Sequence, residues 1–348
     1  IRRQRQMCIR DSSYTTTKPI KMLKIEIIRK IKYHVRTHLG KRLWHLFVDC
    51  KFHLRNWHYL KKLRWKPARQ NKRLYFVIDN RLKHPGLADR FKAIIGCYYL
   101  AKINDLDFKI IYKTPFKLED YLSPNKVDWL AGFADLDYSI MDTRFLNYSD
   151  WHGLPSLKKE KQYHCYNYIG NDILLQIPNS KVMWSNLFHE LFQPTKILSD
   201  AISNTGLKLK SYIAVHLRFV NALDNFESGH FNGLNEEHAI DLIERCKKAI
   251  EQIYIKYGKD TDVICFSDSK RFLDSIKESP IKILDSTSIG HICFNNDENH
   301  ILKSFLDFYL ISRSIKVFRI FAPEMYVNTC YSLYAGIMGE CEVEDLWV

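Results

Sequence analysis

The chain has 348 residues, of which 46% are hydrophobic and 26% are charged. This composition is that of an ordinary globular protein and excludes a disordered, collagenous or small disulfide-rich chain, while the length predicts two domains or one large one. The formal net charge of +14 is unevenly distributed, because residues 18–73 hold 18 Lys and Arg against only Glu26 and Asp49. The basicity therefore belongs to an N-terminal arm, and the body from residue 74 onward is mildly acidic.

Residues 1–17 are expected to be a non-native leader. The run from Gln6 to Ser12 resembles the translation of a sequencing adapter, and Met22 is a candidate for the native start. We therefore leave residues 1–17 out of the reasoning on the fold.

The arm, residues 18–73, has an apolar residue at every fourth position from Leu23 to Leu43, which predicts a helix. Trp44, Trp57 and Trp65 lie among its cations. This combination favours a helix in an anionic membrane interface, where apolar side chains enter the headgroup region and cations meet the phosphates. A helical extension packed on the body is nearly as well supported, and a nucleic-acid site is the weakest of the three interpretations.

From residue 74 onward, apolar β-rich runs alternate with helical patterns. Strands are predicted over 74–78, 108–112, 212–217, 262–266, 281–284 and 316–320, and helices over 88–103, 182–199, 235–257, 270–276, 300–314 and 323–337. Pro194 is expected to kink or shorten its helix, and residues 118–178 are too irregular to assign. Repeated β-α units imply parallel sheets flanked by helices. We therefore predict an α/β fold of two Rossmann-like domains, 74–204 and 205–348, facing each other across a cleft.

The nine cysteines are scattered singly, without C-x-x-C or metal-type spacing, and most lie in apolar runs. This pattern predicts buried thiols in a reducing compartment. The sequence also lacks an apolar run of about 18 residues, the length that a membrane-spanning helix needs. A cytoplasmic location is therefore expected.

The most informative motif is Val215-His216-Leu217-Arg218-Phe219-Val220-Asn221. His216 and Arg218 are two residues apart and so project from one face of the strand as it ends. Ligands of parallel α/β sheets bind beyond the carboxyl ends of the strands, where a planar guanidinium can contact two phosphate oxygens. An arginine that merely pairs with a neighbouring carboxylate is the alternative.

Other candidate residues lie at similar positions. Ser267, Asp268 and Ser269 end the next strand and either contact a ligand or cap the following helix. Asp224 and Glu227, in the loop after Arg218, and Asp89, from the other predicted domain, are weak candidates for a general base.

His216-Leu217-Arg218 resembles the H-x-R motif of the fucosyltransferase superfamily, which includes α1,2- and α1,6-fucosyltransferases, Nod-factor enzymes and protein O-fucosyltransferases. The run from His84 to Arg90 is similar to the Gly-rich opening loop of that group. Asp307 on its helix, followed by Tyr331-Ser332, resembles the last motif, an Asp-containing helix and then a Phe-Ser pair. These matches span about residues 74–340 in the right order, and the bacterial members are the relatives that we favour.

The resemblance implies a GT-B-like fold, a GDP-fucose donor, a glycan acceptor, inverting transfer, and no cofactor or metal. By the same resemblance, Arg218 would bind the β-phosphate and neutralise the departing GDP, and His216 would line the guanine and ribose side. Asp307 would accept hydrogen bonds from guanine, and the hydroxyl of Ser332 would donate a hydrogen bond to a phosphate oxygen. Val220-Asn221 stands where many members have Gly-Asp in the pyrophosphate loop, and Asn221 can still accept or donate a hydrogen bond there. The backbone at Gly86 to Arg90, including Asp89, would approach the donor at a helix start. A turn and a helix cap are the alternative for Gly86 and Asp89.

Competing motifs are weak. The sequence contains neither G-x-G-x-x-G nor G-x-x-x-x-G-K-[ST], which argues against dinucleotide and P-loop sites. D-x-D occurs at Asp105/Asp107, Asp135/Asp137 and Asp260/Asp262, little more often than chance predicts. The leading hypothesis is therefore a GDP-fucose-dependent transferase in surface polysaccharide synthesis, without nucleic-acid partners. A membrane-associated sugar-nucleotide or glycan-binding protein without turnover, and a transferase for another GDP-sugar, are the alternatives.

Overall fold

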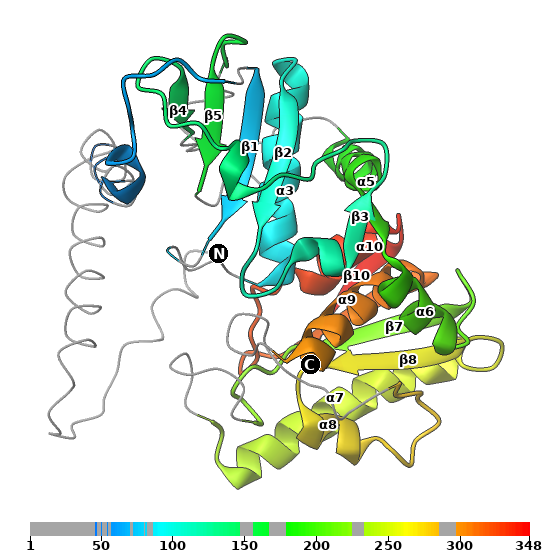
Figure 1. Cartoon of the computed structure of the whole chain (residues 1–348). Helices are drawn as coiled ribbons and strands as arrows, with labels where there is room; N and C mark the ends of the chain where they lie inside the picture. The colour runs from blue at the N-terminus through cyan, green and yellow to red at the C-terminus, as the bar shows by residue number, and fades with distance from the viewer. Residues whose placement is uncertain are drawn as a thin grey trace, which may run out of the picture. The chain divides into compact units, whose positions relative to one another are not determined.

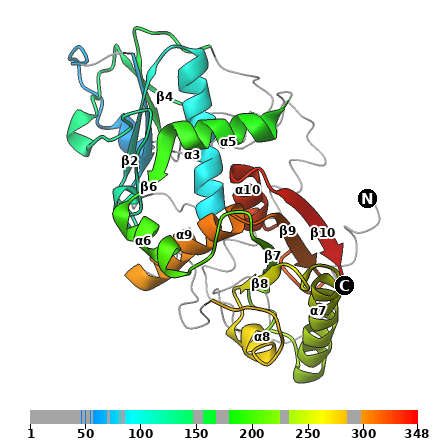
Figure 2. The same cartoon turned by 90° about the vertical axis from the view of Figure 1, so that its right-hand side faces the viewer.

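The computed structural model describes residues 46, 50, 54, 57–69, 72–79, 81, 86–146, 156–166, 179–224, 233–284 and 297–348 (Figures 1 and 2). The chain divides into two compact units, residues 1–62 and 63–348. In the first unit, residues 46, 50, 54 and 57–60 are helical, whereas the helix predicted from Leu23 to Leu43 lies outside the described residues. Within the described residues, no helix is both long enough and apolar enough to cross a membrane.

The N-terminal half of the unit 63–348 is built on a parallel sheet and one long helix. Its elements are β1 (Arg73–Ile78), α3 (Leu87–Ile103), β2 (Asp107–Tyr112), β4 (Thr143–Phe145) and β5 (Gln162–Cys165). The strands pair in the order β2-β1-β5-β4, all parallel. The predicted elements that correspond to β1, α3 and β2 are confirmed. Helix α3 is buried on most of its surface, which explains why its sequence is apolar nearly all round.

The C-terminal half repeats this plan. Its elements are β7 (Tyr212–Leu217), α7 (Glu236–Tyr257), β8 (Asp262–Ser267), α8 (Lys270–Ser275), α9 (Glu298–Ser312), β9 (Lys316–Phe321), α10 (Tyr331–Met338) and β10 (Glu342–Trp347). The strands form a second parallel sheet in the order β10-β9-β7-β8. The two parallel sheets confirm the predicted fold class, whereas the domain boundary at residues 204 and 205 stays a prediction.

The prediction of a single helix over residues 182–199 is wrong. The chain forms α5 (Ser180–Leu191), leaves the helix as β6 (Phe192–Pro194), and starts α6 (Lys196–Asn204). Strand β6 pairs antiparallel with β3 (Leu122–Pro124), in the region that the sequence left unassigned. Pro194 has no N–H for a helical hydrogen bond and disfavours helix in the residue before it, so the chain changes direction here. The same region also holds short 3-10 turns, η1 (Leu118–Asp120) and η2 (Phe133–Asp135).

The helix predicted from residue 323 begins instead at Tyr331. The preceding backbone makes tertiary hydrogen bonds, because the N–H of Tyr326 donates to the carbonyl of Arg218 (3.3 Å) and the carbonyl of Thr329 accepts from Arg319 (3.1 Å). These bonds hold the segment against β7 and β9 in a non-helical conformation.

Two further predictions differ at the sheet edges. The predicted strand at 281–284 makes only an isolated bridge from Lys282 to Ile264. Strand β10 was not predicted, because its sequence Glu-Val-Glu-Asp-Leu-Trp carries three acids. These acids meet cations of β9, and this cross-strand pairing stabilises the edge.

Both faces of the C-terminal sheet are covered (Figure 1). Along β7, Ile213, Val215 and Leu217 belong to the core cluster that contains residues of α7 and α8. Tyr212 and Ala214 belong to the second cluster, which includes α9 and α10 and continues into α3, α5 and the N-terminal sheet. Alternation along the strand therefore turns His216 toward α10.

Candidate functional site

The pairing of β7 with β8 brings Arg218 to Asp268. Leu217 and Ser267, the last residues of these strands, are in register, and Arg218 and Asp268 follow them directly. Nη1 of Arg218 lies 3.6 Å from Oδ2 of Asp268. The pair therefore sits at the carboxyl ends of parallel strands, the place where such sheets bind ligands.

Asp268 also fixes the turn that follows Arg218. Its Oδ1 accepts from the N–H of Phe219 (2.7 Å) and its Oδ2 from the N–H of Val220 (2.9 Å). Val220 has a φ of +56°, a left-handed conformation that a β-branched residue adopts only when its surroundings impose it. Burial raises the pKa of the Asp268 carboxyl, and the Arg218 charge and the two N–H groups oppose that rise. The Asp268 carboxylate therefore stabilises the turn through these two hydrogen bonds.

The neighbouring serines have separate roles. Ser269 is the N-cap of α8, where its hydroxyl accepts from the N–H of Phe272 (3.0 Å), and the hydroxyl of Ser267 accepts from the N–H of Ser269 (3.2 Å). Capping, the alternative that the sequence left open, therefore applies to Ser269.

His216 is buried beside α10. Its Nδ1 lies 3.0 Å from the hydroxyl of Ser332, and its ring is 5.7 Å from that of Tyr331. Burial lowers the pKa of His216 to about 3, and the charges of Arg218 and Arg319 act in the same direction. The imidazole is therefore neutral at physiological pH, and the positive charge at this strand end belongs to arginine.

Two residues of the last motif contact other groups of the protein. The hydroxyl of Ser332 is fully buried against His216. Nζ of Lys303, one helical turn earlier, donates to Oδ1 (2.6 Å) and Oδ2 (2.5 Å) of the Asp307 carboxylate. The i, i+4 spacing is a signal that sequence reasoning missed. Each carboxylate oxygen retains further acceptor capacity, so this ion pair leaves the predicted role of Asp307 untested.

The opening loop lies in the N-terminal half. Gly86 is the N-cap of α3, which is the helix-cap alternative given above for this residue. The carboxylate of Asp89 forms an ion pair with Lys92 (2.5 Å) in the first turn of α3. Arg90 is buried, donates to the hydroxyl of Tyr112 (2.6 Å), and therefore supports the local fold.

The candidate bases are partly described. Asp224 follows the Arg218 turn, and its Oδ2 is buried without a hydrogen-bond partner in the described structure. Asn221 is also buried in this turn. Glu227 lies outside the described residues.

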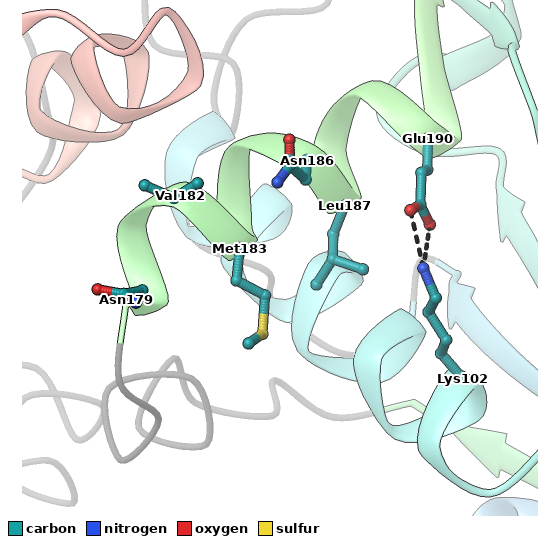
Figure 3. A pocket seen from close by; sticks show the side chains of 7 residues that line it. All are labelled: Lys102, Asn179, Val182, Met183, Asn186, Leu187 and Glu190. Carbon is teal, nitrogen blue, oxygen red and sulfur yellow. Dashed lines mark hydrogen bonds and ion pairs between the residues drawn. The ribbon is translucent and has the colours of Figure 1, made fainter.

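Two observations bear on other kinds of site. The described parts of the chain contain no group of three or more His, Cys, Asp or Glu side chains that could hold a metal ion. A cavity of about 440 Å³ between α3 and α5 is lined by Lys102, Asn179, Val182, Met183, Asn186, Leu187 and Glu190. Figure 3 shows Met183 and Leu187 pointing from α5 toward α3, with the Lys102–Glu190 ion pair at one end. None of the residues predicted for the donor site lines this cavity.

The two parallel sheets and their covering helices define a GT-B-like fold. No protein-family model and no curated protein matches the sequence. Among solved structures, the chain is similar to NodZ α-1,6-fucosyltransferase soaked with GDP-fucose, with 12% identity, a TM-score of 0.52, and coverage of 77% of this chain and 93% of that one. It is also similar to a mutant of Arabidopsis thaliana FUT1 in complex with GDP, with 14% identity, a TM-score of 0.51, and coverage of 95% and 80%. The likeness is one of fold, and it agrees with the resemblance found in the motifs.

If Asp268 fixes the turn, Asp268→Asn should lower the free energy of unfolding by about 2 kcal/mol, because an amide presents only one acceptor oxygen to two N–H donors. Hydrogen exchange at Phe219 and Val220 should accelerate as well. Asp274→Asn, which removes an exposed i, i+3 ion pair with Lys277, is the matched control and should change stability little. Unchanged exchange at both amides would contradict the assignment.

The neutral state of His216 predicts a pH dependence of stability. Its pKa of about 3 in the fold is below the unfolded value of about 6.5, so its contribution is complete above pH 6.5 and is lost as the pH falls. Between about pH 7.5 and about pH 5, the wild type should lose about 2 kcal/mol more than His216→Asn, as measured by urea denaturation. Equal losses in the two proteins would show that His216 takes up a proton as readily in the native state as in the unfolded chain.

Proposed function

We propose that this protein is a glycosyltransferase that moves fucose from GDP-fucose to a hydroxyl of a glycan acceptor, with inversion and without a metal. The observation that carries the proposal is the fixed Arg218 guanidinium beyond β7, in a fold similar to two fucosyltransferases. The first of those structures was soaked with GDP-fucose and the second is a complex with GDP, which supports a GDP-sugar as the donor here.

In the proposed reaction, the acceptor oxygen forms a bond to the anomeric carbon while the bond from that carbon to GDP breaks. The bonding electron pair leaves with GDP, so negative charge grows on the β-phosphate. Arg218 is proposed to stabilise this charge, because a guanidinium held in place needs no reorganisation during the reaction. The acceptor proton passes to a carboxylate, for which Asp224 and Glu227 are our candidates. The buried, unpartnered Oδ2 of Asp224 in the described structure supports the first of these.

The remaining donor contacts are proposed from the motif resemblance. Asp307 would accept from guanine, a neutral His216 would line the nucleoside, and Ser332 and Asn221 would contact the phosphates. Ser267 and Asp268 would border the nucleotide, and Gly86, Asp89 and Arg90 would approach it from the opening loop. Ser332, Asp268 and Arg90 also make hydrogen bonds within the protein, which hold their neighbours in place.

We further infer a cytoplasmic setting, peripheral to the inner membrane face of a bacterium, with a surface polysaccharide precursor as acceptor. The side chains of Cys97, Cys165, Cys246 and Cys265 are buried and form no disulfide in the part of the chain that the structure describes, which suits a reducing compartment. The basic arm supports the peripheral placement.

Arg218→Ala should lower turnover with GDP-fucose by about 10²–10³-fold, the usual effect of removing a strong transition-state donor. Arg218→Lys keeps a charge but not the planar fork and should recover only part of the activity. Arg245→Ala is the control, because Arg245 makes ion pairs with Asp241 and Glu324 on the α7 side of the sheet.

Near-normal transfer by folded Arg218→Ala would refute the central role of Arg218. Calorimetric titration with GDP, UDP and GDP-fucose, followed by transfer assays, tests the alternatives. Tight GDP binding without hydrolysis or transfer would indicate a binding protein, and turnover of a different GDP-sugar would correct the donor.

Activity should persist in excess EDTA, because the proposed cation at the leaving group is a guanidinium. Radiolabelled fucose transfer before and after chelation measures this directly. Loss of transfer that is restored by manganese would instead favour a metal-dependent enzyme that uses one of the D-x-D pairs.

A further inference from the structure

The described helical residues of the arm carry an exposed apolar face. Leu46, Cys50, Leu54 and Trp57, which we call the outer stripe, are each helical, and their spacing of four, four and three residues is that of positions on one side of a helix. All are exposed, with exposed fractions of 58% for Leu46, 77% for Leu54 and 59% for Trp57. A row of this kind is unlike the isolated apolar residues that every protein surface carries.

The buried residue among the described helical residues of the arm lies away from the outer stripe. Tyr59, which helical geometry places roughly opposite Trp57, is only 1% exposed. The described helical residues therefore include a buried tyrosine as well as the exposed outer stripe.

Cations accompany the outer stripe. Nζ of Lys61 lies 5.5 Å from the centre of the Trp57 ring, and residues 18–62 as a whole hold 13 Lys and Arg against Glu26 and Asp49. A tryptophan beside a lysine suits the boundary between headgroups and acyl chains, where the ring is partly buried and the ammonium meets phosphate.

We propose that the outer stripe binds the surface of an anionic lipid bilayer. A nucleic acid would satisfy the cations, but its phosphates would leave Leu46 and Leu54 in water. A second copy of the chain would bury the apolar residues but would bring two strongly basic arms together. An anionic bilayer satisfies both the apolar and the basic groups, since its interior accepts the side chains and its headgroups neutralise the lysines. This inference is independent of the reaction proposed above.

The test is co-sedimentation of the full chain with vesicles of phosphatidylcholine and phosphatidylserine, against vesicles of phosphatidylcholine alone. Leu54→Ser and Trp57→Ser should each weaken binding about tenfold, since each removes a large apolar group from the interface. Lys61→Gln should weaken it about fivefold and should reduce the salt dependence. Ile255→Ser is the matched control, because Ile255 on α7 is 75% exposed but lies outside the arm, and it should bind like the wild type.

Binding to the mixed vesicles, reduced by the stripe variants and not by Ile255→Ser, would support the proposal. Absence of binding at low salt, or equal binding to both kinds of vesicle, would overturn it. Binding of RNA or DNA without vesicle binding, or dimerisation abolished by Leu54→Ser, would overturn it in favour of the other occupants. Circular dichroism of each variant, together with a second pair, Leu46→Ser and Cys50→Ser, separates loss of the surface from loss of the fold.

Discussion

The Asp268 carboxylate is the group on which the arrangement at the end of β7 depends. It is buried, so its oxygens need hydrogen-bond donors from the protein, and it finds them in the backbone of Phe219 and Val220 and beside the side chain of Arg218. These three residues are consecutive, so satisfying one carboxylate dictates a tight turn. The left-handed conformation of Val220, at a cost of roughly 1–2 kcal/mol, is the consequence.

The same carboxylate lies 3.6 Å from the guanidinium of Arg218, so its charge helps to hold that side chain beyond β7. An anion that binds to a fixed cation does not have to order a mobile side chain, so less of the binding energy is lost. The surrounding charges support this arrangement. Lys316 and Arg319 of β9 pair with the acids of β10, and His216 is neutral, so neither β9 nor the imidazole competes with Arg218 for an anion.

The helices α9 and α10 join the two halves of the unit 63–348. Their apolar residues belong to the same core as α3, α5 and the N-terminal sheet, while their polar side chains, Asp307 and Ser332, lie near His216 and Tyr331. Packing of the core and placement of the candidate site therefore depend on the same helices.

The sequence by itself determined most of the long regular elements and the parallel pairing expected of them, because repeated burial of one helix face or of whole strands leaves a periodic pattern. It also located Arg218 at a strand end. Only the tertiary structure decided the roles of Asp268 and Ser332 and the conformations of β3 to β6, β10 and residues 323–330. In each of these cases the deciding hydrogen bond or ion pair joins residues far apart in the chain, such as Asp268 to Val220 or Tyr326 to Arg218. The periodicity of a short segment does not identify such distant partners, because these residues come together only when the sheets form.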